Sequence, residues 1–182
     1  LRAGLRPDHP VLEEAGLSGC RFSVEASPTG ESIGLRLKAA PACLAAVSAV
    51  DYQGLYTGYD ENGSGSARGW HGFTKRREPV AYVGRPTSAP FAATWDLSML
   101  PDQQDMAVRA LVRFAKHPEL VYRTAPAEAL ATPARRGAVR LYPVRELPRP
   151  FWSRAGRKVT AEIDLDVDPA RIERAELHVV VW

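Results

Sequence analysis

The sequence predicts an all-β protein built as an antiparallel β-sandwich, and three observations lead to this fold class. Short segments in which apolar and polar residues alternate recur along the chain, turns rich in Gly and Pro separate them, and no convincing helical period is present. With 182 residues, of which 45% are hydrophobic and 25% charged, the composition is that of an ordinary soluble globular protein. This length allows one sizeable core or two small ones.

The first two expected strands form a hairpin. Residues 22–26 alternate apolar and polar side chains, and Pro28-Thr29-Gly30 supplies a turn. Ile33, Leu35 and Leu37 then alternate with more polar neighbours. Because successive side chains of a strand point to opposite faces, the hairpin is expected to bury one face.

The central strands follow in order. We expect a long strand over residues 44–56 with Tyr52 and Tyr56 in phase, a short strand over 80–83, and another over 91–95. The cleanest period of two in the chain lies between residues 106 and 114, and a strand over 121–124 closes the set. The side chains expected to point inward together are Val108, Ala110, Val112 and Phe114, with Phe91, Ala93 and Trp95. A slip of one residue would turn Arg109 and Arg113 into the core, so the register is well specified.

The chain divides into four parts. Residues 1–16 have no clear period and are expected to be an arm, 17–131 the sandwich, 132–137 a linker, and 138–182 a second β segment. The elements expected in the last part are strands at 139–142, 160–167 and 177–182, with one helical turn capped by Asp168. Three strands cannot enclose a core by themselves. This segment therefore packs on the sandwich or opens a second one that continues past residue 182.

Two cysteines, Cys20 and Cys43, lie on either side of the predicted hairpin. A disulfide there would suit an exported β-domain. Two buried free thiols are the alternative, because cysteine is among the most buried residue types. The placement predicts Cα atoms less than about 7 Å apart, which is within bridging reach.

Charge and hydropathy exclude two classes of partner. The net charge is only +3 and the basic residues are spread along the chain, so no nucleic-acid surface is expected. The clusters at 75–77 and at Arg135-Arg136 are expected to be solvated loops. No apolar run approaches the roughly 18 residues that a membrane helix requires. A start without Met and an end inside an apolar run lead us to expect a processed chain or a fragment.

The stretch Asp60-Glu61-Asn62-Gly63-Ser64-Gly65 places oxygen ligands at every second position, with glycines where the chain must turn. A loop of this kind wraps calcium, and the expected ligands are the side chains of Asp60, Asn62 and Ser64 with the carbonyl oxygen of Ser66. The usual acidic residue at loop position twelve is replaced by His71, so a further carboxylate would come from Glu61, Asp51 or Glu78. The alternative is a plain Gly-Ser turn that favours Asp and Asn.

Aromatic residues crowd around the same loop. Those expected to contact a ligand are Tyr56, Tyr59, Trp70, His71 and Phe73. Aromatic faces offer a stacking platform for sugar rings, which present apolar C–H groups. The alternative is that two or three of these side chains cover the sandwich core beneath a long loop.

Catalytic signatures are sparse. The sequence has no Gly-x-Ser-x-Gly elbow, no Walker loop and no dinucleotide fingerprint, and its four histidines lack a metal-ligand spacing. One enzyme hypothesis remains, a hydrolase that uses Asp60, His71 and Asp96.

Residues 47–131 resemble the bacterial immunoglobulin-like domains that occur in tandem on secreted and surface proteins. The matching pieces are the strand over 47–52, Val83-Gly84, the segment 89–96 ending in Trp95-Asp96, and the strand over 106–114. Two departures stand out. The family's tight first hairpin is replaced by the long insertion 59–79, and a Gly turn is replaced by Lys116-His117-Pro118-Glu119. The resemblance implies an immunoglobulin-like sandwich that acts as a spacer or binding module, without catalysis.

The sequence thus favours a non-catalytic immunoglobulin-like module of a secreted or surface bacterial protein, mediating adhesion, assembly or glycan contact. Its expected partners are a glycan, another surface protein or neighbouring domains, with calcium as the expected ion and an extracellular or cell-surface location. A carbohydrate-binding accessory domain and the hydrolase are the alternatives.

Overall fold

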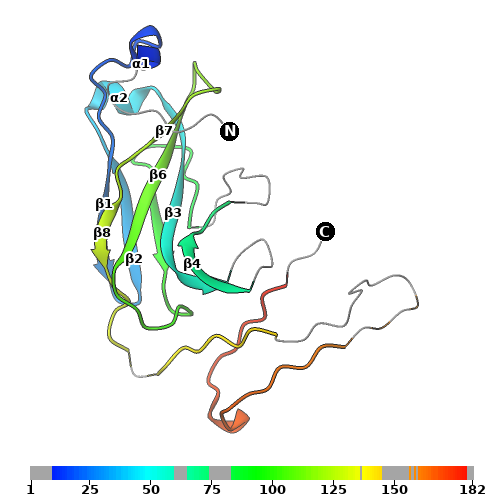
Figure 1. Ribbon diagram of the computed structural model, residues 1–182. Helices are drawn as coiled ribbons and strands as arrows, with labels where there is room; N and C mark the ends of the chain where they lie inside the picture. Colours follow the sequence, from blue (N-terminus) through cyan, green and yellow to red (C-terminus); the bar gives the residue numbers. More distant parts are fainter. Residues whose placement is uncertain are drawn as a thin grey trace.

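The fold was obtained as a computed structural model, which describes residues 10–59, 65–73, 83–135, 137–144, 156, 158 and 160–179. Two antiparallel sheets pack face to face, which confirms the predicted all-β sandwich (Figure 1). One sheet has three strands in the order β1-β2-β5. The other has five, ordered β4-β3-β6-β7, with β8 also paired to β6.

The three-stranded sheet contains the predicted hairpin. Strands β1 (Ser23–Thr29) and β2 (Ser32–Lys38) pair from Ser23 opposite Lys38 to Thr29 opposite Ser32. Gly30 occupies the turn with φ +58°, a conformation that glycine adopts without strain. Strand β5 (Ala92–Asp96) then pairs with β2. The alternate residues of β2, from Ile33 to Leu37, are buried as the alternation requires.

The five-stranded sheet is built around one long strand. Its members are β3 (Val47–Tyr59), β4 (Ser66–Trp70), β6 (Met106–Phe114), β7 (Val121–Arg123) and β8 (Ala127–Leu130). Strand β3 pairs with β6 along most of its length and with β4 over its second half. The expected strand over 80–83 lies mostly outside the described residues, and Gly84 makes a single bridge to Tyr52. The sheet around β3 and β6 therefore extends to β4 along the second half of β3 and to Gly84 beside Tyr52.

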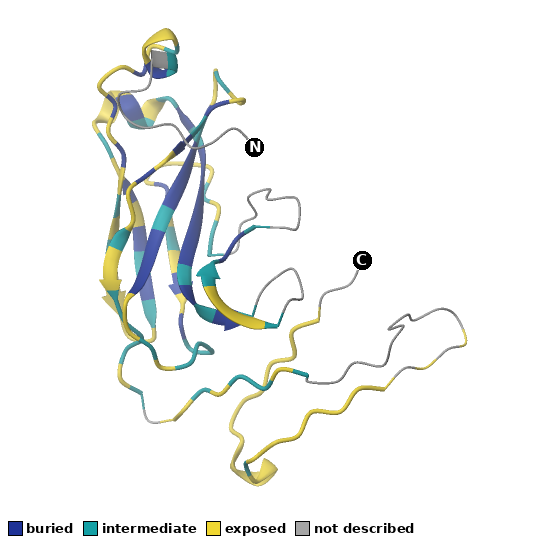
Figure 2. Cartoon of the chain, in the orientation of Figure 1, coloured by how far each residue is buried: buried dark blue, intermediate teal, exposed yellow. Residues whose placement is uncertain are grey.

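The core lies between the two sheets. The prediction that alternate residues of the strand over 106–114 point into it is confirmed. Val108, Ala110, Val112 and Phe114 are at most 1% exposed. From the facing sheet, Phe91 and Trp95 are buried and Ala93 is partly buried against them. Figure 2 shows β3 and β6 mostly in dark blue as the buried centre of the fold, whereas β1, β4 and β8 are mostly teal or yellow. Each fully buried side chain of valine or phenylalanine size contributes about 1.5–3 kcal/mol relative to exposure.

Contact between the sheets depends on one glycine in β3. A Cβ atom added to Gly54 would lie 2.6 Å from the ring of Trp95, which belongs to the opposite sheet. Trp95 also packs at 5.4 Å from the ring of Tyr56. Glycine at position 54 therefore lets a bulky tryptophan approach the backbone of β3.

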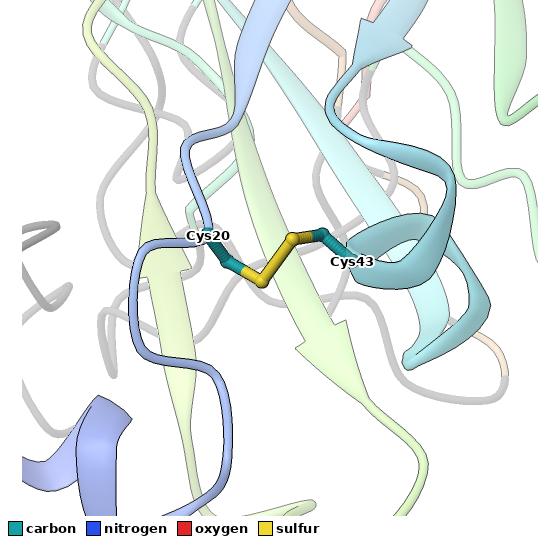
Figure 3. Close-up of a disulfide and its surroundings, with 2 residues drawn as sticks. All are labelled: Cys20 and Cys43. Carbon is teal, nitrogen blue, oxygen red and sulfur yellow. A yellow bond between two sulfur atoms is a disulfide. The ribbon is translucent and has the colours of Figure 1, made fainter.

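A disulfide closes one end of the sandwich. Cys20 and Cys43 are bonded, with Cα atoms 5.7 Å apart, so the predicted proximity is confirmed and the free-thiol alternative is wrong (Figure 3). Cys43 lies in α2 (Pro41–Ala45), a single helical turn. Proline is favoured in the first turn of a helix, where Pro41 stands. The expected strand over 44–56 consequently begins later, at Val47. The bridge joins this turn to the chain just before β1.

The described part of the N-terminal arm belongs to the sandwich. Residues 10–16 include α1 (Pro10–Glu14), whose Leu12 is only 1% exposed and joins the core with Leu17. The expectation of a separate arm therefore does not apply to these residues. One buried leucine on a single helical turn is too little for sequence periodicity to reveal.

The segment 132–135 is fixed to the sandwich. Thr132 exchanges hydrogen bonds with the backbone of Gln103, and the Arg135 side chain is 6% exposed. Arg135 donates to the carbonyl oxygens of Leu97, Ser98 and Leu100, so the prediction of a solvated arginine was wrong here. A buried guanidinium has five N–H donors to satisfy; these carbonyl oxygens accept three hydrogen bonds, and Asp102 Oδ1 accepts a fourth from Nε at 2.9 Å.

The described parts of the chain beyond residue 137 form an extended arm outside the two sheets (Figures 1 and 2), and this arm contacts the sandwich at Tyr59, whose hydroxyl lies 2.9 Å from the Tyr142 amide. No strand is found in its described parts, 137–144 and 160–179, so the strands expected at 139–142 and 160–167 are not formed there. Ile163 and Leu165 remain exposed because no partner strand covers them. Asp168 does cap one turn, η1 (Pro169–Arg171), by accepting from the Ala170 amide, as predicted. In the described ranges, no helix has the length and apolar character needed to cross a membrane.

Candidate ligand-binding face

The outer face of the five-stranded sheet carries the most elaborate polar cluster of the described residues. Alternation on β3 and β6 turns Tyr52 and Tyr56 inward, and it turns Asp51, Gln53 and Arg109 outward. Yet Asp51 and Gln53 are both 0% exposed, so the face is covered around these two residues, whereas Arg109, Trp70 and Phe73 beside them are partly exposed. Buried polar groups need partners, and each of these has specific ones.

Asp51 is the centre of an ion-pair network. Its Oδ2 accepts a hydrogen bond of 2.8 Å from Arg113 Nε. Arg85 Nε lies 3.1 Å from Oδ1, but the alignment is not that of a hydrogen bond, and Oδ1 accepts none within the described residues. Arg85 belongs to the segment whose Gly84 and Pro86 carbonyl oxygens accept from the β3 backbone. The network thus holds this segment on the edge of the sheet. Asp51 is engaged by two arginines and is no spare calcium ligand.

Gln53 fixes the position of Arg109. Its Nε2 donates to the carbonyl oxygen of Gly72 at 2.9 Å, and its Oε1 accepts from Arg109 Nε at 3.0 Å. The guanidinium carbon of Arg109 lies 4.0 Å from the centre of the Trp70 ring and 5.6 Å from that of Phe73. These are cation–π distances. Burial, together with the neighbouring charge of Arg123, lowers the pKa of Arg109 to about 10.

The five aromatic and histidine residues predicted to form one ligand surface are distributed over three places. Tyr56 and His71 are buried, with their rings stacked at 4.0 Å, and His71 Nε2 lies 3.1 Å from the Tyr56 carbonyl oxygen. Trp70 and Phe73 lie on the outer face beside Arg109. Tyr59 faces the C-terminal arm, where its hydroxyl accepts from the Tyr142 amide. Only Trp70 and Phe73 are therefore brought together at a partly exposed position.

The predicted calcium loop connects β3 to β4. Asp60, Asn62 and Ser64 lie outside the described residues, whereas Ser66 is exposed, begins β4 and pairs with Tyr59. Within the described ranges, no group of three acidic, histidine or cysteine side chains is arranged to hold a metal ion. Calcium binding stays a prediction.

The residues of the hydrolase hypothesis are not assembled. Asp96 is exposed at the end of β5, and its Oδ1 accepts from the Ser98 amide at 2.8 Å. This hydrogen bond holds the pKa of the Asp96 carboxyl below its ordinary value. His71 is buried against Tyr56 in the other sheet, and Asp60 lies outside the described residues. No described pair of these groups shares a site.

The sequence interpretation missed Gln53 and Arg109 as functional candidates. Gln53 stands directly opposite Arg109 in the β3–β6 ladder. A glutamine among the otherwise apolar or aromatic residues of a long strand was a usable signal, because a buried amide requires partners. No family model, no curated protein and no solved structure matches the chain.

Proposed function

We propose that this chain is a non-catalytic immunoglobulin-like module of an exported bacterial protein, acting outside the cell or at its surface, and that it contacts a glycan. Through this glycan contact the module would mediate adhesion or assembly with another surface protein. The observation that carries the proposal is the cluster of Trp70, Phe73 and Arg109 on the outer sheet face, with Arg109 fixed by Gln53.

The disulfide supports export. Disulfide bonds form and persist in oxidising compartments and are rare in the cytosol. The Cys20–Cys43 bridge joins two segments that lack strand pairing with each other, so it stabilises the end of the sandwich covalently. A module that works outside the cell gains from this, because no chaperone restores it there.

The composition of the cluster supports glycan contact. A tryptophan ring offers a flat apolar surface to the C–H faces of a sugar, and a guanidinium donates hydrogen bonds to hydroxyl or acidic oxygens. Trp70 and Phe73 are partly exposed, and a sheet face is rigid. Rigid groups lose little conformational entropy when a ligand binds.

The test is binding of the purified chain to an array of bacterial and plant polysaccharides. We expect retention on at least one polysaccharide and a loss of about tenfold or more in affinity for Trp70→Ala, since a stacked aromatic is typically a dominant contact. Arg36→Ala, an exposed change on β2 of the other sheet, is the matched control and should bind as the parent does. Absence of binding to every polysaccharide, or unchanged binding by Trp70→Ala, would contradict the proposal.

A further inference from the structure

We propose that the outer face of the five-stranded sheet is an anion-binding site, in which Arg109 and Arg123 bind the acidic group of a polysaccharide while Trp70 contacts the adjoining sugar ring. The ligand class is an acidic glycan, with a uronate carboxylate as the principal group and a sulfate ester as the second source of the same chemistry. This inference rests on the proposed function and names its ligand.

The described residues of this face carry more positive than negative charge. Four arginines, Arg85, Arg109, Arg113 and Arg123, lie on or beside it, and Asp51 is the carboxylate that pairs with Arg85 and Arg113. Within the described residues, neither Arg109 nor Arg123 has a carboxylate within the 4.0 Å of an ion pair. Among the described residues, these two cations therefore lie near each other without a counter-charge, which an anionic ligand would supply.

The remaining donors of Arg109 are well placed for such a ligand. Its Nε is taken by Gln53, which is itself held by the carbonyl oxygen of Gly72. The two terminal nitrogens have no hydrogen-bond partner among the described residues. A guanidinium binds a carboxylate or sulfate through a parallel pair of N–H groups, and such charge-assisted bonds are about twice as strong as neutral ones.

Burial makes this arginine more than a solvated surface charge. Arg109 is partly buried beside the rings of Trp70 and Phe73, and its lowered pKa reflects that burial and the repulsion from Arg123. In such an environment an oppositely charged group interacts more strongly than it would in water. An anion bound at the site would offset the cost of the desolvated Arg109 charge and the repulsion between the two arginines.

The site should therefore discriminate by charge. A neutral glycan would stack on Trp70 but would leave Arg109 and Arg123 without a counter-ion, whereas an acidic glycan would satisfy all three groups. Part of the attraction comes from exposed Arg123, so binding should weaken as ionic strength rises.

The experiment compares matched polysaccharides on the full chain. Pectate, alginate and hyaluronan oligomers are each presented beside their carboxyl-reduced forms, with dextran sulfate and dextran as the sulfate pair, and affinities are measured by calorimetry at two salt concentrations. We expect at least one acidic member to bind about tenfold or more tightly than its neutral counterpart. Arg109→Gln should lose about tenfold or more, Arg123→Gln should lose less, and Arg36→Gln should bind as the parent does.

The outcomes separate the two proposals. Equal binding of acidic and neutral members would overturn the anion site and leave glycan contact standing, and no binding to any member would overturn both. Binding to dextran sulfate alone would support the anion site with a sulfate as its source. If Arg109→Gln fails to fold, as judged by its melting curve, the exposed Arg123→Gln decides: affinity for the acidic member unchanged in that variant would contradict the inference.

Discussion

The hydroxyl of Tyr52, on β3, donates a hydrogen bond of 2.7 Å to the backbone carbonyl oxygen of Phe91, at the start of the β5 segment in the opposite sheet. Both residues are buried. This polar contact therefore joins the two sheets inside the core, where an unpaired carbonyl would be costly.

Tyr52→Phe should destabilise the protein by about 1–3 kcal/mol, because the Phe91 carbonyl would lose its partner in the core. Urea denaturation gives the free energy of unfolding. Tyr122→Phe is the matched control, since Tyr122 is a buried tyrosine whose hydroxyl makes no hydrogen bond within the described residues. Equal losses in the two variants would show that the Tyr52 bond adds nothing specific.

The same tyrosine predicts a loss of stability at alkaline pH. Burial raises the pKa of Tyr52 well above its ordinary value, which is near 10 in the unfolded chain. A raised pKa gives stability that is complete below about pH 10 and falls as pH rises further, by about 1.4 kcal/mol per pH unit for one proton. Unfolding free energies between pH 8 and pH 11.5 should fall more steeply for the parent than for Tyr52→Phe. Parallel curves would contradict this.

Removal of the disulfide by Cys20→Ser together with Cys43→Ser should lower the free energy of unfolding by about 3 kcal/mol. The bridge spans 23 positions of sequence, and that is the size of effect expected for a loop of this length. Melting curves with and without a reductant provide the check. The reductant should shift the parent toward the double variant and should not shift the double variant itself.

Loss of the buried Asp51 carboxylate should lower the free energy of unfolding more than loss of its half-exposed partner Arg85. Asp51→Asn should cost about 3 kcal/mol or more, because it removes the counter-charge of Arg113 in a covered site. Arg85→Ala should cost about 1 kcal/mol or less, since the Arg85 side chain is 43% exposed and is not aligned for a hydrogen bond. Chemical denaturation of both variants measures the difference, and a larger loss for Arg85→Ala would reverse our ranking.

Calcium binding by the loop before Ser66 is tested by titration. With one certain carboxylate, Asp60, the dissociation constant should be about 10⁻⁴–10⁻³ M. Because Trp70 ends the strand that follows the loop, its fluorescence should change on binding and the melting temperature should rise. Asp60→Ala should abolish both responses. No response in the parent at several times that concentration would leave a plain Gly-Ser turn.

Strands with one apolar face could be predicted from the sequence, because apolar and polar residues alternate along them. Strand β6 alternates so cleanly that its inward residues followed from the sequence, and the hairpin of β1 and β2 did too. Strand β4 was missed because Ser66–Trp70 has no apolar alternation and forms by pairing with β3. Helix α2 was missed because five residues are too few to show a helical period.

The candidate site was less predictable. Alternation placed Arg109 outside the core, but its contact with Trp70 depends on the β3–β4 register, in which Leu55 lies opposite Trp70. That register could not be predicted, because β4 has no apolar alternation that would align it with β3. The aromatic residues looked like one group because they are close in sequence, yet Trp70 and His71 point to opposite faces of the strand end, as neighbours in a strand must.

For the surface module that we propose, the position of the disulfide would have a mechanical consequence. After the strands separate, a pulling force along the chain passes from Cys20 to Cys43 through the covalent bridge, so the backbone of β1 and β2 between them is not stretched. Even with all strands separated, the residues between Cys20 and Cys43 would remain a closed loop. The fully extended oxidised chain would therefore be shorter than the fully extended reduced chain by roughly 80 Å. The same bond that closes the sandwich would therefore limit how far the module stretches under shear.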